Sequence, residues 1–172
     1  HFDFGSLLRR IARSRRPPAI FTKRDLGVVR RALAEGRLLA DRQFSIALKV
    51  LKWFLHSRRA GEGRLLVLNG LPRHCGQARD IAGHVDVVLV IYLDCRRGHV
   101  KARIAGNVGL DRTGRTDDTA AAVAMRIAIF EKRTKPLLAY YRRNGIRIVV
   151  LKVGRATRPE RMLSELRHSG GC

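Results

Sequence analysis

Asn69-Gly70-Leu71-Pro72-Arg73 follows the apolar run at residues 65–68, and Gln77 comes four residues after the arginine. An apolar run that ends in a polar, glycine-containing turn before a helix-like segment is typical of the carboxyl end of a strand. In open α/β sheets ligands bind at that edge, where an arginine can hold a phosphate or carboxylate through its two-pronged guanidinium. This stretch therefore predicts a strand followed by an anion-binding turn.

The rest of the chain alternates between strand-like and helix-like segments. Apolar, β-branched runs predict buried parallel strands at residues 65–68, 85–93 and 146–153. Helices are predicted at residues 26–34, 41–55, 98–105, 119–133 and 135–143, and Phe44, Leu48, Leu51 and Leu55 are expected to form the apolar face of the second. Paired prolines, Pro17-Pro18, should end any helix that begins at Ser6. This alternation indicates an α/β fold: a doubly wound, mainly parallel sheet with helices on both faces.

A second group of polar and charged residues, at residues 114–141, adds to the prediction made from residues 69–77. Gly114-Arg115-Thr116-Asp117-Asp118 is followed by Arg126 and then by Tyr140-Tyr141 before the last predicted strand. The order and spacing resemble the adenylate kinase and nucleoside monophosphate kinase family from residue 1 to about residue 166. The resemblance implies a P-loop kinase-like fold forming a single domain over residues 1–172. Within it, residues 9–60 resemble the monophosphate-binding subdomain and residues 103–118 a short lid without zinc.

The resemblance also assigns candidate site residues. The monophosphate-binding set would be Gly5, Arg9, Gly70, Arg73 and Gln77, with Gln77 reading the base. Arg103, Arg115 and Arg126 would hold the transferring phosphoryl group. The implied reaction moves the terminal phosphoryl group of ATP, with Mg²⁺, to a nucleoside monophosphate.

Several departures from the family pattern oppose that activity. No G-x-x-x-x-G-K loop occurs in the 172 residues, and that loop supplies the main electrostatic stabilisation of phosphoryl transfer. Asn69 stands where the family has an aspartate that organises magnesium, Phe4 stands where a threonine contacts the nucleotide, and Asn107 replaces a lid arginine. The family's first, central strand is missing as well. Either the chain is a fragment, another polypeptide supplies the strand, or the sheet is rearranged.

Charge points to a different partner. The chain holds 36 Lys and Arg against 14 Asp and Glu, a net charge of +22, which calls for a polyanion. The segment from Arg9 to Arg31 is densest, with only Asp25 among the acids. Its candidate RNA-contacting residues are Arg10, Arg13, Arg15, Arg16, Lys23, Arg24, Arg30 and Arg31. The alternative is a solvated surface of an unusually basic enzyme. Aromatic residues make up only 6% and do not interleave with the basic runs, so we expect backbone contacts and not stacked bases.

Other residue types suggest no further chemistry. No apolar run is long enough for a membrane span, and we expect no membrane partner. Three cysteines at wide spacings predict neither disulfides nor a metal site, so Cys75 is interpreted as a packing thiol and the neighbouring His74 is expected to face solvent. No signal peptide is visible. We expect an intracellular protein, with the mitochondrial matrix as the leading location.

Two hypotheses remain. In the first, the chain is a catalytically degenerate adenylate-kinase-like protein with no cofactor. It would be a structural subunit of a large ribonucleoprotein, with a mitochondrial ribosome as the leading candidate, and would contact the RNA backbone and neighbouring subunits. In the second, it is a fragment of an active nucleoside monophosphate kinase that binds ATP, Mg²⁺ and a nucleoside monophosphate. A G-x-x-x-x-G-K-[ST] loop preceding His1 would favour the second.

Overall fold

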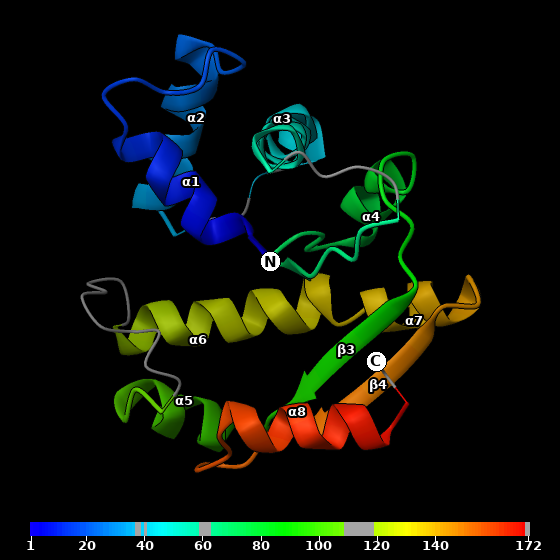
Figure 1. Ribbon diagram of the computed structural model, residues 1–172. Coiled ribbons are helices and arrows are strands. Elements are labelled where there is room, and N and C mark those ends of the chain that lie inside the picture. Colours follow the sequence, from blue (N-terminus) through cyan, green and yellow to red (C-terminus); the bar gives the residue numbers. More distant parts are fainter. Residues whose placement is uncertain (37–38, 40, 59–62, 109–118, 171–172) are drawn as a thin grey trace. The chain divides into compact units, whose positions relative to one another are not determined.

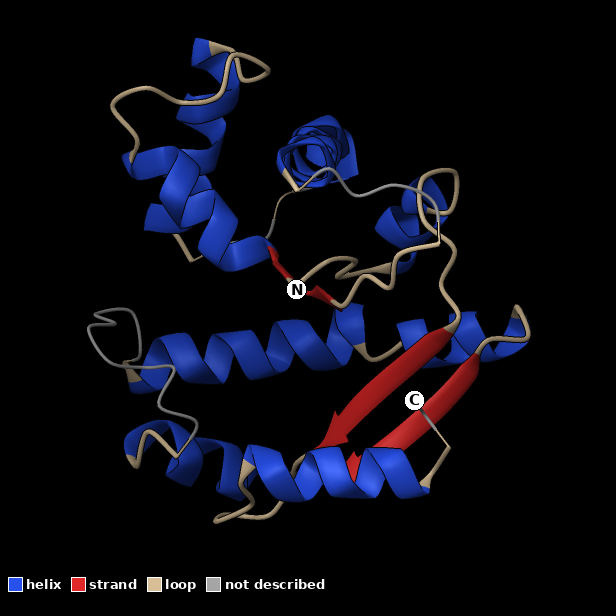
Figure 2. Ribbon diagram, in the orientation of Figure 1, coloured by secondary structure: helices blue, strands red, loops and turns tan. Residues whose placement is uncertain are grey.

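The computed structural model describes residues 1–36, 39, 41–58, 63–108 and 119–170 (Figure 1). The chain divides into two compact units, His1–Val85 and Asp86–Cys172. Each unit has its own helices and its own pair of parallel strands. Figure 2 shows the helices in blue and the strands in red. The assignment of residues 1–172 to a single domain stays a prediction.

The first unit pairs two very short strands. Its elements are β1 (Phe2–Asp3), α1 (Phe4–Arg13), α2 (Lys23–Ala34), α3 (Phe44–Ser57), β2 (Leu68–Asn69) and α4 (Cys75–Ile81). A single turn of 3₁₀ helix at Asp41–Gln43 precedes α3. β1 and β2 run parallel, with Phe2 opposite Leu68 and Asp3 opposite Asn69. The strand predicted at residues 65–68 therefore lies further along the chain and is shorter.

Helix ends in the first unit follow from local sequence. Asp3 caps α1 by accepting a hydrogen bond from the Ser6 N–H, and α1 ends at Arg13 before the paired prolines, as predicted. At the start of α2, Thr22 and Asp25 form a capping box in which each side chain accepts a bond from the other's backbone N–H. This box places the start of α2 three residues before the predicted helix.

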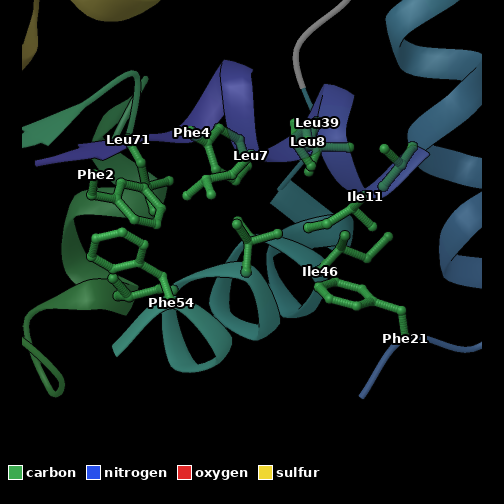
Figure 3. Close-up of a cluster of buried hydrophobic side chains, with 14 of the residues drawn as sticks. Phe2, Phe4, Leu7, Leu8, Ile11, Phe21, Leu39, Ile46, Phe54 and Leu71 are labelled. Atoms are coloured by element: carbon green, nitrogen blue, oxygen red, sulfur yellow. The ribbon is translucent and has the colours of Figure 1, made fainter. Parts of the chain in front are cut away.

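A continuous apolar cluster fills the first unit (Figure 3). Phe2 is completely buried and makes an edge contact with Phe54, with ring centroids 5.2 Å apart. The predicted apolar face of α3 is only partly right. Leu51 is buried, but Phe44, Leu48 and Leu55 are half-buried, and the core positions besides Leu51 are Ile46, Ala47, Val50 and Phe54. The polar residues of this helix lie along one side, at spacings of four, three and four from Ser45 to His56, and the buried side is the opposite one, which the predicted apolar face only partly matches.

The second unit is built on a longer parallel pair. Its elements are β3 (Leu89–Asp94), α5 (Arg97–Ala105), α6 (Ala120–Ile129), α7 (Leu137–Arg143), β4 (Arg147–Lys152) and α8 (Pro159–His168), with a π-helical turn at Phe130–Thr134. β3 and β4 pair in register from Leu89 opposite Arg147 to Asp94 opposite Lys152. Asn144 and Gly145, the latter with φ +73°, end α7 at the predicted helix stop.

Burial in this pair differs from the prediction of strands covered on both faces. Val149 and Leu151 of β4 pack with Leu166 of α8. Leu89 of β3 packs against this cluster as well, but Ile91 and Leu93, which share that face of the pair, are 41% and 50% exposed. In the described part of the chain, β3 has β4 as its one strand neighbour.

The fold class is α/β with parallel strands, as predicted. That a further strand completes a single sheet stays a prediction. None of the described helices combines the length and the apolarity needed to cross a membrane.

Candidate functional site

The carboxyl ends of β1 and β2 meet in the first unit. Asn69 Nδ2 donates to Asp3 Oδ2 over 3.4 Å, while the other oxygen of Asp3 accepts from the Ser6 N–H over 2.8 Å. Asp3 therefore joins the end of β2 to the first turn of α1. This arrangement fixes where two glycine-arginine pairs of the predicted site lie, Gly5 with Arg9 and Gly70 with Arg73.

Both arginines fold back over a glycine at this edge. Arg73 Nε donates to the Gly70 carbonyl over 3.0 Å, and a Cβ on Gly70 would stand 3.3 Å from Arg73 Nη2 and 3.5 Å from Phe4 Cβ. Gly70 has φ +80°, a conformation that other residues rarely adopt. Arg9 Nη1 lies 3.5 Å from where a Cβ on Gly5 would be. Because Phe4 and Gly5 are chain neighbours, the structure brings the two glycines and two arginines of the five predicted residues to one edge.

Gln77 lies beside them but faces inward. Its side chain is buried, and its Oε1 accepts a hydrogen bond from the Arg73 N–H over 2.8 Å. In this geometry Gln77 fixes the turn that carries Arg73. Its reading of a base stays a prediction.

His74 does not face solvent as expected. It is 5% exposed and caps α4, because its Nδ1 accepts from the Gln77 N–H over 3.3 Å. In the sequence, His74 lies three residues before Gln77, which is the spacing between an N-cap residue and the amide that it caps.

In the second unit, Arg103 anchors a loop. Its Nη1 donates to the carbonyls of Gly154, Arg155 and Thr157 over 3.1, 3.4 and 2.6 Å. The loop is further closed by a bond of 2.9 Å from the Gly154 N–H to Thr157 Oγ1. Arg103 thus positions the backbone that follows β4.

The remaining phosphoryl-site candidates are less informative. Arg126 lies half-buried on α6. Arg115, and with it most of the predicted lid at residues 103–118, lies outside the described residues. The joint role of Arg103, Arg115 and Arg126 stays a prediction.

Comparisons with known proteins agree with the resemblance. No protein-family model matches the chain. An adenylate kinase of Bifidobacterium longum is 30% identical over 141 residues, which cover 78% of this chain and 72% of that protein. An adenylate kinase of Xylella fastidiosa is 29% identical over 160 residues, covering 90% and 78%. UMP-CMP kinase 1 of Oryza sativa is 24% identical over 147 residues, covering 84% and 54%.

The chain belongs to the adenylate kinase family. The roles of Gly5, Arg9, Gly70 and Arg73 in binding a monophosphate stay predictions. Membership of the family does not by itself assign an activity to this chain. Two residues that the sequence analysis identified as departures from the family pattern, Phe4 and Asn69, make contacts within the fold. Phe4 is 6% exposed in the core and stacks on Phe2, with ring centroids 6.1 Å apart. Asn69 is engaged with Asp3.

The family member also carries a basic surface on α1, α2 and the loop between them. All eight predicted RNA-contacting residues are exposed: Arg10, Arg13, Arg15, Arg16, Lys23, Arg24, Arg30 and Arg31. Arg30 Nε donates to the Ala12 carbonyl over 3.1 Å and so ties α2 to the end of α1. Asp25, the one acid of the segment, is bound to Lys49 Nζ over 2.7 Å. Burial acts to raise the pKa of Asp25, but hydrogen bonds from Lys49 and Thr22 hold it below its ordinary value.

One aromatic contact at this surface was not predicted. The Arg10 guanidinium lies over the Trp53 ring, with its carbon 4.8 Å from the ring centroid. Trp53 comes from α3, so no local pattern connects it with Arg10. Along α1, an open groove of about 400 Å³ is lined by Ser6, Arg9, Arg10, Arg13 and Ser14.

Cysteines and metal ligands add little. Cys75 and Cys95 are free and half-buried. Burial raises the pKa of the Cys95 thiol. The negative charge of Asp94 adds to this increase, and the positive charge of Arg103 acts against it. Among the described residues, no three His, Cys, Asp or Glu side chains are grouped as metal ligands.

Proposed function

We propose that this adenylate kinase family member is an RNA-contacting structural subunit of a large ribonucleoprotein, with a mitochondrial ribosome as the leading candidate, and that the 172 residues do not transfer phosphoryl groups. The observation that carries the proposal is the basic surface of α1, α2 and their connection. Eight Lys and Arg side chains are exposed there, and the segment's single carboxylate is already bound to Lys49.

Such a surface favours a polyanion for a physical reason. Each phosphate neutralised by Lys or Arg releases condensed counterions, so affinity depends steeply on salt concentration. Guanidinium groups also suit phosphate better than ammonium groups do, because they donate two parallel hydrogen bonds. All of the eight exposed residues except Lys23 are arginines, and Asp25 is the one carboxylate within their segment. RNA backbone is the proposed ligand, and neighbouring protein subunits would contact the rest of the surface.

The absence of transfer activity is proposed from the site itself. The sequence holds no G-x-x-x-x-G-K loop. Phe4 contributes its ring to the core in place of a polar nucleotide contact, and Asn69 donates to Asp3 in place of a carboxylate that would organise Mg²⁺. With neither the loop amides nor that carboxylate, the chain lacks the preorganised charges that phosphoryl transfer requires.

The test measures RNA binding and phosphoryl transfer on the same purified chain. We expect RNA affinity that falls linearly with salt on logarithmic axes, and no formation of ADP from ATP, Mg²⁺ and AMP. Replacing Arg13, Arg16 and Arg24 with Gln should lower the salt slope by about 0.7–0.9 for each lost phosphate contact. A control with the same change of charge replaces the exposed Arg155, Arg158 and Arg167, and it should retain the slope. Equal losses in both variants, or robust ADP formation, would contradict the proposal.

A second candidate function has its own support. The convergence of Gly5, Arg9, Gly70 and Arg73 at one sheet edge fits a nucleoside monophosphate, and the relatives are named adenylate kinase and UMP-CMP kinase. In this alternative the chain is part of an active nucleoside monophosphate kinase that uses ATP and Mg²⁺. Calorimetric titration with AMP, CMP and UMP tests it. Monophosphate binding that is lost in Arg73→Ala, together with transfer activity, would favour the enzyme.

A further inference from the structure

We infer that Arg10 and Trp53 form a stacking platform for an unpaired RNA base, with Arg13 and Arg9 beside it to hold the adjoining phosphate. This inference rests on the proposed RNA contact and specifies the form of the RNA: a single strand. It departs from the expectation of backbone contacts alone, which rested on the lack of aromatics within the basic runs.

The platform is built from two helices. Arg10, exposed on α1, lies over the indole of Trp53 on α3 at 4.8 Å. Trp53 is half-buried, so its position is set by the packing of α3 and not by solvent. The contact between guanidinium and indole is itself attractive, and it restricts a side chain that would otherwise sample many rotamers. Arg10 is therefore held in place before any ligand binds.

A guanidinium held in this way offers its outer face to a base. Unpaired RNA bases stack on aromatic rings and on arginine planes, and such stacking tolerates any base because each has a π face. Duplex bases are already stacked on their neighbours and cannot use the platform. The arrangement therefore selects single-stranded RNA without selecting its sequence.

The groove beside the platform supplies charge. Arg9, Arg10 and Arg13 follow Ser6 by three, four and seven residues, and these spacings place all four along one side of α1. Neither Arg10 nor Arg13 pairs with a carboxylate of the described residues, so both charges are available. The groove of about 400 Å³ is open, as a passing polymer requires, and comparable with the roughly 300–1,000 Å³ of small-ligand sites.

Trp53 is the one tryptophan of the chain, so its fluorescence reports directly on the platform. The probes are a 12-nucleotide single-stranded RNA and a blunt 12-base-pair RNA duplex. We expect the single strand to change Trp53 emission in a saturable way. Arg10→Lys keeps the charge but removes the plane, and it should weaken single-strand binding about five- to a hundredfold with the salt slope unchanged. Arg167→Lys, an exposed residue on α8 outside the basic surface, is the matched control and should bind as the unaltered protein does.

The outcomes separate this inference from the proposed function. RNA binding with equal affinities for Arg10→Lys and Arg167→Lys overturns the platform and leaves the basic surface intact. So does single-strand binding that saturates with no change in Trp53 emission. Failure to bind either RNA overturns both. A second variant, Trp53→Leu, should lose single-strand preference over the duplex, while its far-UV circular dichroism confirms that α3 is still folded.

Discussion

His1–Val85 encloses a continuous cluster of buried apolar side chains, whereas Asp86–Cys172 leaves similar side chains exposed along its strands. In the first unit, Phe2 and Leu51 are completely buried although β1 is only two residues long. In the second, β3 and β4 are six residues long and fully paired, yet Leu93 is 50% and Val150 52% exposed.

Regular backbone pairing and core burial are therefore separate sources of stability in this chain. Helices α1, α2, α3 and α4 supply most of the first unit's core, so its two-residue strands are held by side-chain packing. In the second unit the long ladder and polar anchors such as Arg103 hold the backbone, while fewer of the described apolar side chains are buried than in the first unit. Variants that remove apolar volume should therefore affect the first unit far more than the second.

The largest expected effect follows from truncating the buried aromatic. Phe2→Ala removes a ring that is 0% exposed and contacts Phe54, and it should destabilise the first unit by about 3–5 kcal/mol. Leu93→Ala in the second unit removes a half-exposed side chain and should cost less than about 1 kcal/mol. Hydrogen exchange in a urea series, resolved by peptide, assigns each loss to its unit. Similar losses at both positions would remove the distinction between the units.

Parts of this fold were open to prediction from the sequence. The strand predicted at residues 146–153 matches β4 to within one residue at each end, because a run rich in Ile and Val lies between two turn signals, Asn144-Gly145 and Gly154. β1 was not predicted as a strand. Two residues carry no period, and this strand exists only because Leu68 and Asn69, distant in sequence, pair with it.

The candidate site divides in the same way. Gly70 and Arg73 were found from a local motif, and Gly5 and Arg9 from the resemblance to the family. The exposed positions of the basic segment followed from charge alone. The Arg10–Trp53 contact and the carbonyl partners of Arg103 were missed. Both depend on tertiary packing between elements far apart in the chain, and side-chain type gives no signal for such a contact.

The polar anchor of the second unit provides the next test. Arg103→Ala should destabilise that unit by about 1.5–3 kcal/mol, because the Gly154 and Thr157 carbonyls lose a charged donor. Arg97→Ala, on the same helix, is the matched control. Its ion pair with Glu131 is largely exposed to solvent, which screens it, so its loss should change the stability of the unit little. Thermal unfolding measures both changes, and faster exchange at residues 154–157 in Arg103→Ala alone would locate the effect. An equal loss in Arg97→Ala would show that the anchor has no special role.

Charge within the first unit gives a smaller, pH-dependent effect. The pKa of Asp25 is lowered in the folded chain, so its ionised form favours folding. That contribution is complete above the unfolded pKa of about 3.9 and is lost as the pH falls through the folded value. Asp25→Asn should therefore destabilise the first unit at pH 7, and the difference from the unaltered protein should shrink as the pH falls below the ordinary pKa of a carboxyl group and through the lower folded value. Urea unfolding at several pH values measures it, with the exposed Asp80→Asn as control. A pH-independent difference would assign the effect to packing.

Two glycines give effects of similarly modest size, and these effects should have opposite signs in the two units. Gly27 lies within α2 and has open space where a Cβ would stand, so Gly27→Ala should stabilise the first unit by about 0.5–1 kcal/mol through the lower entropy of the unfolded chain. Gly145 also has open space, but its φ of +73° disfavours any residue with a Cβ, so Gly145→Ala should cost the second unit about 1–2 kcal/mol. Since neither methyl is crowded, the two variants isolate backbone conformation from packing. If Gly145→Ala were neutral in urea unfolding, the turn between α7 and β4 would not depend on the left-handed conformation. Backbone conformation would then contribute less to the stability of the second unit than the comparison with the first unit implies.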